Sequence, residues 1–246
     1  MSYQNSHTLL NIENLKKSYA GKPVVDGLDF HVLAGEVVGL LGPNGAGKTT
    51  AFYMTMGLIR PDHGKVFFQG HDITQLPIHE RSKRGMGYLA QEPSIFRQLS
   101  VEENISCILE TLSLSKQEQK ERLQVLLQEL GLTTLAHKKA CTLSGGQRRR
   151  LEITRALVTR PSLLLLDEPF ANIDPLAVQD VKKLILLLKN KGISVLITDH
   201  NAREIFSIVD RSYLMADGKV MISGTVDELL QNSQARQSYL GEDFCM

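Results

Sequence analysis

The spacing of apolar residues changes several times along the chain, and each change predicts a different element. Apolar residues dominate three strand-length segments near the start, at 9–19, 24–33 and 37–41. Two more apolar runs without alternation follow much later, at 163–166 and 193–197. Unbroken runs of this length are typical of central parallel strands that are covered on both faces. These segments therefore predict an α/β core.

Between these strand-like parts the spacing becomes helical. Ser100 and Glu103 have the spacing of a capping box, and the leucines of 117–130 repeat at helical intervals before Gly131. Near the end, Asp217-Gly218 separates two short strand-like segments and predicts a hairpin. Residues 174–175, Asp-Pro, are expected to begin another helix that ends near residue 191.

The predicted domain organisation follows from these changes. The chain is expected to form a single domain, 1–246, with a core made of residues 1–92 and 161–224. A helical subdomain at about 93–160 is inserted into that core, and a C-terminal helix and tail occupy 225–246.

Composition excludes several classes of protein. The 28 basic and 27 acidic side chains give a net charge of +1, too little for a general electrostatic attraction to nucleic acid. The three cysteines are scattered and form no CxxC pair, which argues against a disulfide or zinc framework. The first residues lack a secretion signal and no apolar run spans a membrane, so we expect a cytoplasmic location and no nucleic-acid partner.

The most specific motif follows the apolar run 37–41. Residues 42–50, here called the phosphate loop, read Gly-Pro-Asn-Gly-Ala-Gly-Lys-Thr-Thr and match G-x-x-x-x-G-K-[ST]. Glycines let backbone N–H groups converge on phosphate oxygens, Lys48 reaches the outer phosphates, and Thr49 offers a hydroxyl to Mg²⁺. The expected nucleotide-binding residues of this loop are Gly42, Asn44, Gly45, Gly47, Lys48, Thr49 and Thr50.

Two carboxylates end the apolar run 163–166. Asp167 at the tip of the predicted strand is expected to hold Mg²⁺, and Glu168 is expected to orient an attacking water. Seen alone, two solvated acidic residues at a strand end are the less favoured alternative.

A second glycine turn precedes these carboxylates. Residues 143–147, here called the signature turn, read Leu-Ser-Gly-Gly-Gln and are also a capping box, so alone they would indicate only a helix start. Placed before the Asp-Glu strand, the turn resembles the signature motif of ABC ATPases, and the likeness covers nearly the whole chain. The resemblance implies an α/β P-loop NTPase core with a helical insert and an antiparallel β subdomain, which binds ATP and Mg²⁺.

The resemblance also implies roles for single residues. Tyr19 matches the aromatic that stacks on adenine, Gln91 the glutamine that touches Mg²⁺, and His200 the histidine that contacts the γ-phosphate. The catalytic residues implied are Glu168, His200 and Lys48, and the metal ligands are Thr49, Gln91 and Asp167. In a head-to-tail homodimer, the partner copy would contribute Ser144, Gly145, Gly146 and Gln147.

Two other segments are left open by the sequence. Residues 171–174 resemble the D-loop, but only Asp174 matches the usual pattern. The basic run Arg148–Arg150 follows the signature turn and is expected to be a solvated helix face, with one member helping to anchor anionic groups and without a catalytic role.

A narrower resemblance points to one kind of transporter. The segments 167–171, 198–204 and 239–244 are similar to those of ATPases that drive lipopolysaccharide extraction from the inner membrane of Gram-negative bacteria. This implies a peripheral location on the cytoplasmic face of that membrane and two transmembrane permease subunits, docked in a groove near Gln91 and Phe96. Phe96 could instead pack inside the helical insert.

Three alternatives compete with that interpretation. An ATPase of a branched-chain amino acid importer would share the architecture but would not be expected to carry the ending at 239–244. A DNA-repair ATPase head would need a long coiled coil between the two glycine turns, and residues 50–143 contain no sustained heptad pattern. A small-molecule P-loop kinase would have no use for the signature turn.

Overall fold

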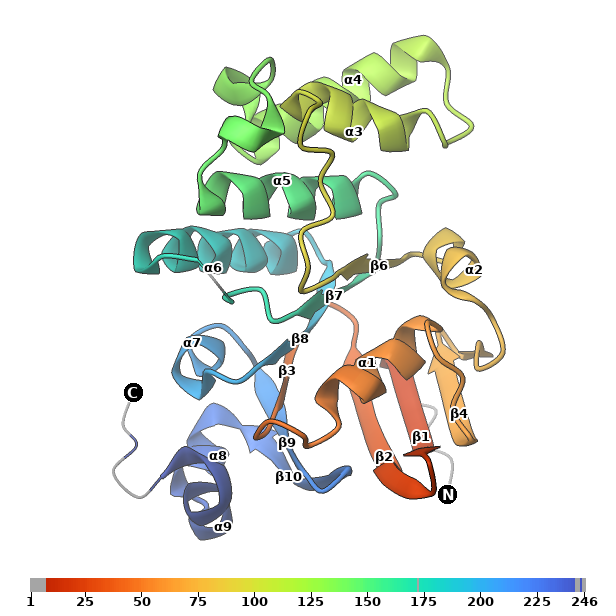
Figure 1. Cartoon of the computed structure of the whole chain (residues 1–246), viewed down its shortest axis with the longest axis vertical. Coiled ribbons are helices and arrows are strands. Elements are labelled where there is room, and N and C mark those ends of the chain that lie inside the picture. Colours follow the sequence, from red (N-terminus) through yellow and green to blue (C-terminus); the bar gives the residue numbers. More distant parts are fainter. Residues whose placement is uncertain (1–7, 172, 242–243, 245–246) are drawn as a thin grey trace.

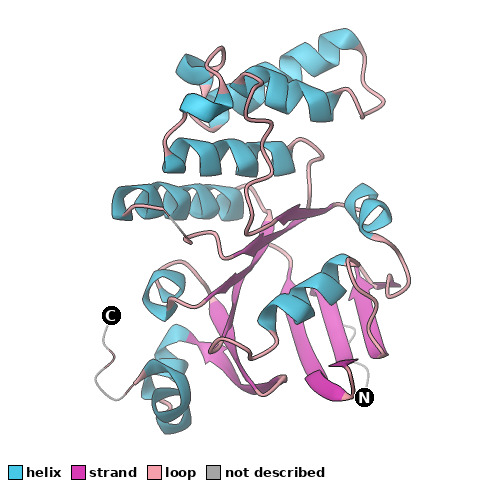
Figure 2. Ribbon diagram, viewed as in Figure 1, coloured by secondary structure: helices cyan, strands magenta, loops and turns pink. Residues whose placement is uncertain are grey.

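Two β-sheets and a stack of helices make up the molecule (Figure 1). The structure is a computed structural model and describes residues 8–171, 173–241 and 244. Figure 2 shows the strands in the lower half of the view, with a layered group of helices above them. In the described ranges, no helix combines the length and the apolar character that crossing a membrane requires.

The larger sheet is mainly parallel and carries the site. Six described strands lie in the order β10-β9-β3-β8-β7-β6, and only the β9–β10 pair is antiparallel. Their bounds are β3 (Val37–Leu41), β6 (Met86–Leu89), β7 (Leu163–Asp167), β8 (Ser194–Asp199), β9 (Arg211–Ala216) and β10 (Lys219–Thr225). Leu164 and Leu166 of β7 face one hydrophobic core while Leu163 and Leu165 face the other, so this strand is buried on both sides.

The smaller sheet is antiparallel and covers helix α1 (Lys48–Met56). The described strands lie in the order β2-β1-β4-β5, with bounds β1 (Thr8–Tyr19), β2 (Lys22–Leu33), β4 (His63–Phe68) and β5 (His71–Asp72). One hydrophobic core joins this sheet, α1 and the near face of the parallel sheet, through residues such as Leu10, Phe52 and Leu40. Burying α1 between the sheets fixes the phosphate loop at its start.

Helices cover the other face of the parallel sheet. Between β6 and β7 the chain forms α3 (Val101–Leu109), α4 (Lys116–Glu129) and α5 (Gly145–Leu157), and after β7 it forms α6 (Pro175–Asn190). Each of the helices α3 to α5 begins with a capping box, at Ser100, Ser115 and Ser144. Figure 1 shows α6 and then α5 stacked above the sheet, with α3 and α4 beyond them. The subdomain boundary at about 93–160 stays a prediction.

Shorter helices connect and close the fold. They are α2 (Ile78–Lys83), α7 (Ala202–Phe206), α8 (Val226–Gln231), α9 (Ser233–Ala235) and a π-helical turn (Arg236–Leu240). The last three follow β10 and bring the end of the chain back beside α7, where the rings of Phe206 and Phe244 lie 6.1 Å apart.

The observed elements agree with the predicted fold class and correct some details. The hairpin around Asp217-Gly218 and the buried strand at 163–166 are confirmed. Strand β8 contains residues 194–197 of the predicted apolar run and ends at Asp199, directly before His200. Strand β6 and helix α2 were missed, because four residues with a central glycine and a six-residue charged helix carry little periodic signal.

Candidate active site

The carboxyl ends of three parallel strands bring the predicted site residues together. Leu41 of β3 pairs with Asp199 of β8, and Asp167 of β7 pairs with Thr198 of β8. The phosphate loop follows β3, Glu168 follows β7 and His200 follows β8. Ligands of open α/β sheets bind at this edge, so the geometry places the candidate site here.

The glycines of the phosphate loop are required by its backbone. Gly42, Gly45 and Gly47 have φ angles of 155°, 84° and 96°. A Cβ atom on Gly42 would lie 2.2 Å from the carbonyl oxygen of Met215, and one on Gly47 would lie 2.5 Å from that of Val24. Any larger residue would therefore force the loop away from its neighbours.

Lys48 lies buried beneath this loop, with 7% of its surface exposed. Its Nζ donates hydrogen bonds to the carbonyl oxygens of Gly42 at 2.7 Å and Pro43 at 3.0 Å. Burial lowers the pKa of Lys48, while the carboxylates of Glu168, Asp199 and Asp167 act in the opposite direction. The ammonium group therefore faces three carboxylates at a loop whose residues Asn44, Gly45 and Thr49 are exposed to solvent.

Two carboxylates at this edge are almost fully buried. Burial raises the pKa of Asp167, although the Thr198 hydroxyl donates to its Oδ1 at 2.6 Å and lowers it in part. Burial likewise raises the pKa of Asp199. Oδ1 of Asp199 accepts the N–H groups of His200 at 2.8 Å and Asn201 at 2.9 Å, whereas its buried Oδ2 has no hydrogen-bond partner among the described residues.

Glu168 lies at the centre of the predicted catalytic residues. Its Oε2 accepts a hydrogen bond from Nε2 of Gln91 at 2.8 Å, and Nδ1 of His200 lies 3.8 Å from its Oε1. The backbone of Glu168 has a positive φ of 44°, a conformation that costs a non-glycine residue about 1–3 kcal/mol and is common at functional sites. The structure therefore brings Glu168, Gln91 and His200 into one group.

Arg149 is a residue of this site that sequence reasoning did not assign. Within the basic run 148–150, Arg149 is the member that leaves the solvated face, because it is 7% exposed and pairs with the carboxylate of the buried Glu152 at 2.9 Å. Its guanidinium also donates to the carbonyl oxygens of Ala90 at 3.2 Å and of Asp167 and Glu168, both at 3.4 Å. The available signal was helical spacing, since position 149 shares a face with the apolar Ile153.

Comparison of the chain with known protein families identifies the family to which it belongs. The family model described as "ABC transporter" matches residues 25–171. The chain belongs to the ABC transporter ATPases. It is therefore an ATP-binding protein and an ATP hydrolase of that family.

Several ABC proteins are similar over nearly their whole length. The lipopolysaccharide export system ATP-binding protein LptB of Acidithiobacillus ferridurans is 53% identical over 96% of this chain and 98% of its own length. LptB of Escherichia coli strain K12 is 46% identical with the same coverage. A crystal structure of an ATP-binding cassette of an ABC transporter in its ADP conformation has a TM-score of 0.86 at 30% identity, covering 96% of this chain and 99% of that one.

The ABC signature turn is not part of the group around Glu168. Ser144 caps α5 by accepting from the N–H of Gln147 at 3.3 Å, and Gln147 Oε1 accepts from the Ser144 N–H at 3.1 Å. Figure 1 places the start of α5 away from the loop that leads into α1. Within one copy, the two glycine turns of this ABC ATPase are therefore separate.

Two further predicted positions lie at the edge of the described site. Tyr19, at the end of β1, is 48% exposed, and Nζ of Lys17 lies 5.8 Å from its ring centre. An exposed aromatic face is available there for stacking. Of the predicted D-loop, Asn172 lies outside the described residues, while Asp174 caps α6 by accepting from the N–H of Ala177 at 3.0 Å.

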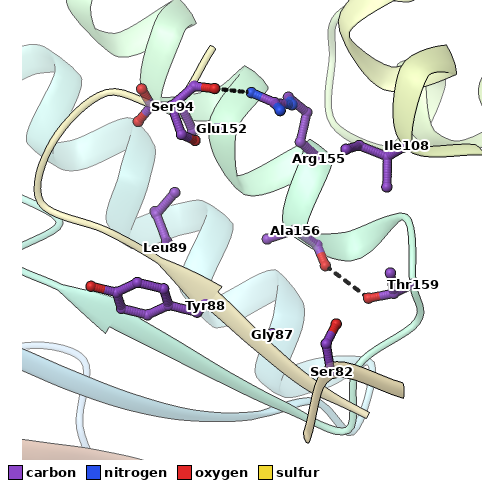
Figure 3. Close-up of a pocket in the computed structure, with 10 residues that line it drawn as sticks. All are labelled: Ser82, Gly87, Tyr88, Leu89, Ser94, Ile108, Glu152, Arg155, Ala156 and Thr159. Carbon is purple, nitrogen blue, oxygen red and sulfur yellow. Dashed lines mark hydrogen bonds between the residues drawn. The ribbon is translucent and has the colours of Figure 1, made fainter. Parts of the chain in front are cut away.

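A groove opens beside the segment that follows Gln91. It has a volume of about 210 Å³ and runs between β6, α3 and α5 (Figure 3). Arg155 donates to the carbonyl oxygen of Ser94 in this groove, and its guanidinium lies 4.9 Å from the ring centre of Phe96. Phe96 is 49% exposed, so it does not pack inside the helical insert, and the alternative that made it a core residue is wrong.

Proposed function

We propose that this chain is the ATP-hydrolysing subunit of a transporter that extracts lipopolysaccharide from the inner membrane. ATP hydrolysis is supported by one observation, the group of four side chains at one edge of the parallel sheet, namely Lys48, Gln91, Glu168 and His200. The cargo is supported by relatives named as lipopolysaccharide export proteins at 46–53% identity over nearly the whole chain. An ATPase of a branched-chain amino acid importer is the less favoured alternative.

The chemistry follows from the charges at that edge. Backbone N–H groups of the phosphate loop and Lys48 would neutralise the phosphates of ATP, with Thr49 and Thr50 beside them. Glu168 would accept a proton from the attacking water, and Gln91 and His200 on its two sides would hold that water in place. Tyr19 would stack on the adenine.

The residues at this edge also suit a magnesium ion. Mg²⁺ prefers oxygen ligands and is usually held by one or two protein groups together with substrate phosphates. Three oxygen donors are available, namely the exposed hydroxyl of Thr49, the amide oxygen of Gln91 and the carboxylate of Asp167. Since Gln91 uses its amide nitrogen to bond Glu168, its oxygen is directed elsewhere. Bound there, the ion would offset phosphate charge.

A second copy of the chain would complete the site. A Cβ atom on Gly145 would have Cγ2 of Ile173 as its nearest neighbour at 3.8 Å, an ordinary contact, so the chain itself does not require glycine there. A close approach by a nucleotide held on the partner copy would require it. Ser144, Gly145, Gly146 and Gln147 would then close over ATP bound to the partner's phosphate loop.

The groove beside Phe96 would receive the membrane subunits. Asn104 is fully buried and holds the loop in place, because it accepts from the Phe96 N–H at 2.8 Å and donates to the Phe96 carbonyl at 3.0 Å. A half-exposed aromatic ring stacked with an arginine on a fixed loop suits a protein interface. Two permease subunits, one for each copy, would hold the ATPase at the cytoplasmic face of the inner membrane.

The proposed function is tested by co-purification. The tagged chain, produced in a Gram-negative host, is recovered from detergent-solubilised membranes, and its partners are identified by mass spectrometry. We expect two transmembrane subunits together with lipopolysaccharide, and release of Pi by the complex with ATP and Mg²⁺. Recovery of amino acid importer subunits instead would contradict the cargo, and phosphate transfer to a metabolite would contradict the reaction.

The groove is tested by the Phe96→Ala variant in the same experiment. Removing the ring should reduce co-purification of the membrane subunits by at least about tenfold, the effect of a central interface aromatic. Val125→Ala is the matched control, because Val125 is also a half-exposed apolar residue but lies on α4, away from the groove. Equal recovery with both variants would show that the subunits dock elsewhere.

A further inference from the structure

The C-terminal segment of the chain contacts the backbone of the active site. The hydroxyl of Tyr239, in the π-helical turn 236–240, donates a hydrogen bond to the carbonyl oxygen of His200 at 2.9 Å. The backbone N–H of Gly42 faces the same hydroxyl and lowers the pKa of Tyr239 in part. One side chain near the end of the chain therefore lies between the first residue of the phosphate loop and the histidine that faces Glu168.

Packing fixes this segment against helix α7. Leu229 and Ala235, in the two helices before the turn, are fully buried. After the turn, the ring of Phe244 meets that of Phe206 edge-on, at 83°, and the guanidinium of Arg203 lies 5.9 Å from the Phe244 ring centre. The segment is therefore packed both before Tyr239 in the chain, through Leu229 and Ala235, and after it, through Phe244. Helix α7, which Phe244 contacts, begins only two residues after His200.

The side chain of His200 depends on its backbone for its position. The ring is 59% exposed, and Nδ1 lies 3.8 Å from Glu168 and 3.5 Å from Asp199, both too long for a well-formed hydrogen bond. The backbone is held more firmly, because the His200 N–H donates to Asp199 at 2.8 Å and the carbonyl accepts from Tyr239 at 2.9 Å. These two hydrogen bonds fix the backbone from which the exposed ring extends toward Glu168.

The Tyr239 hydroxyl keeps its proton at neutral pH. Burial and the nearby Asp199 carboxylate raise the pKa of Tyr239 to about 12. The hydroxyl can therefore donate to the His200 carbonyl throughout the neutral pH range.

We propose that Tyr239 is a positioning residue for ATP hydrolysis, which holds the backbone of His200 in place beside the phosphate loop through its hydroxyl. This rests on the proposed function, since it assumes that His200 acts on bound ATP. The C-terminal segment then sets the geometry of the catalytic histidine from outside the nucleotide site.

The Tyr239→Phe variant tests this, because it removes one oxygen and keeps the packed ring. Loss of one hydrogen bond should lower kcat about 5- to 10-fold, with KM for ATP unchanged within about twofold. Amide hydrogen exchange of the peptide that contains residues 200–206 should become faster. Ser238→Ala is the matched control, because it removes an exposed hydroxyl of the same turn that donates to the local carbonyl of Gln234, and it should match the native chain in both measurements.

A double-mutant comparison shows whether Tyr239 acts through His200. Adding Tyr239→Phe to a His200→Ala chain should lower the single-turnover rate no further, because the histidine is already absent. An equal loss in both backgrounds, a raised KM with normal kcat, or unchanged hydrogen exchange would each overturn the inference. Absence of hydrolysis by the native complex would instead overturn the proposed function, while the exchange measurement would still test the contact itself.

Discussion

Gly42 and Gly47 of the phosphate loop have positive φ angles, whereas Gly145 and Gly146 of the signature turn are part of helix α5. In the phosphate loop an added Cβ would collide with backbone oxygens of the same chain. In the signature turn Gly145 has room for one, and only Gly146 approaches a neighbour, with its Cβ position 2.8 Å from that of Ala177. The phosphate loop needs glycine to fold. The chain's own packing does not require glycine at position 145, whereas a nucleotide bound to a partner copy would.

The largest effect is expected at the residue that both turns would serve. Glu168→Gln keeps the shape of the side chain but removes the carboxylate proposed to accept the proton, so hydrolysis should fall about 10³-fold while ATP binding is retained. The ATP-bound dimer should then accumulate, which size-exclusion chromatography with ATP and Mg²⁺ would measure. Hydrolysis at the native rate would remove Glu168 from the role of base.

The next effect shows whether the phosphate loop needs glycine for folding, independently of nucleotide binding. Gly42→Ala combines a strained backbone angle with a collision against Met215, and it should lower the free energy of unfolding by about 3 kcal/mol. Chemical denaturation without nucleotide measures this directly. If the variant were as stable as the native chain, the loop would be more adaptable than its geometry indicates.

The matching change in the signature turn should leave the fold intact. Gly145→Ala should not reduce stability, because alanine at a helical position is compatible with the backbone and has room there. If the partner's ATP lies against this turn, the added methyl group should reduce hydrolysis about 10²-fold. Destabilisation with normal activity would contradict the difference drawn between the two turns.

The smallest effect concerns the buried carboxylate beside the phosphate loop. Burial raises the folded pKa of Asp167 above 3.8, so its contribution to stability is complete below 3.8 and is lost as pH rises through the folded pKa. Asp167→Asn does not titrate, so its Tm relative to the native chain should increase toward neutral pH, by roughly 2–4 °C. Thermal unfolding of both chains without nucleotide, from acidic to neutral pH, shows whether this difference in Tm increases with pH. A constant difference in Tm would show that burial does not disfavour the ionised form.

Sequence reasoning was strongest where local pattern and structure coincide. The buried strands, the capping boxes and the phosphate loop depend on neighbours in sequence, and the carboxyl ends of β3, β7 and β8 then bring Lys48, Asp167, Glu168 and His200 to one edge. The loop after β6 adds Gln91, which bonds Glu168 across 77 positions of the chain.

The parts that could not be predicted are single contacts between distant segments. Tyr239 reaches His200 across 39 positions from a polar tail with no periodic pattern. Of the terminal motif 239–244, Glu242 and Asp243 lie outside the described residues. That Arg149 is the buried member of the run 148–150 could not be predicted, because a run of identical charges does not show which member faces inward.

Arg149 has a mechanical consequence for the whole enzyme. Its guanidinium joins α5 to the end of β7 and to the residue before Gln91, and Glu152 neutralises its charge. Separating these elements would break the hydrogen bonds from this charged guanidinium to the carbonyl oxygens of Ala90, Asp167 and Glu168, at about 1.5–3 kcal/mol each, while Glu152, on α5 itself, would stay paired with Arg149. Helix α5 and the tip of β7 are therefore coupled through one side chain. A hinge between the nucleotide and a membrane partner is expected beyond the ends of that helix, where no such coupling has to be broken.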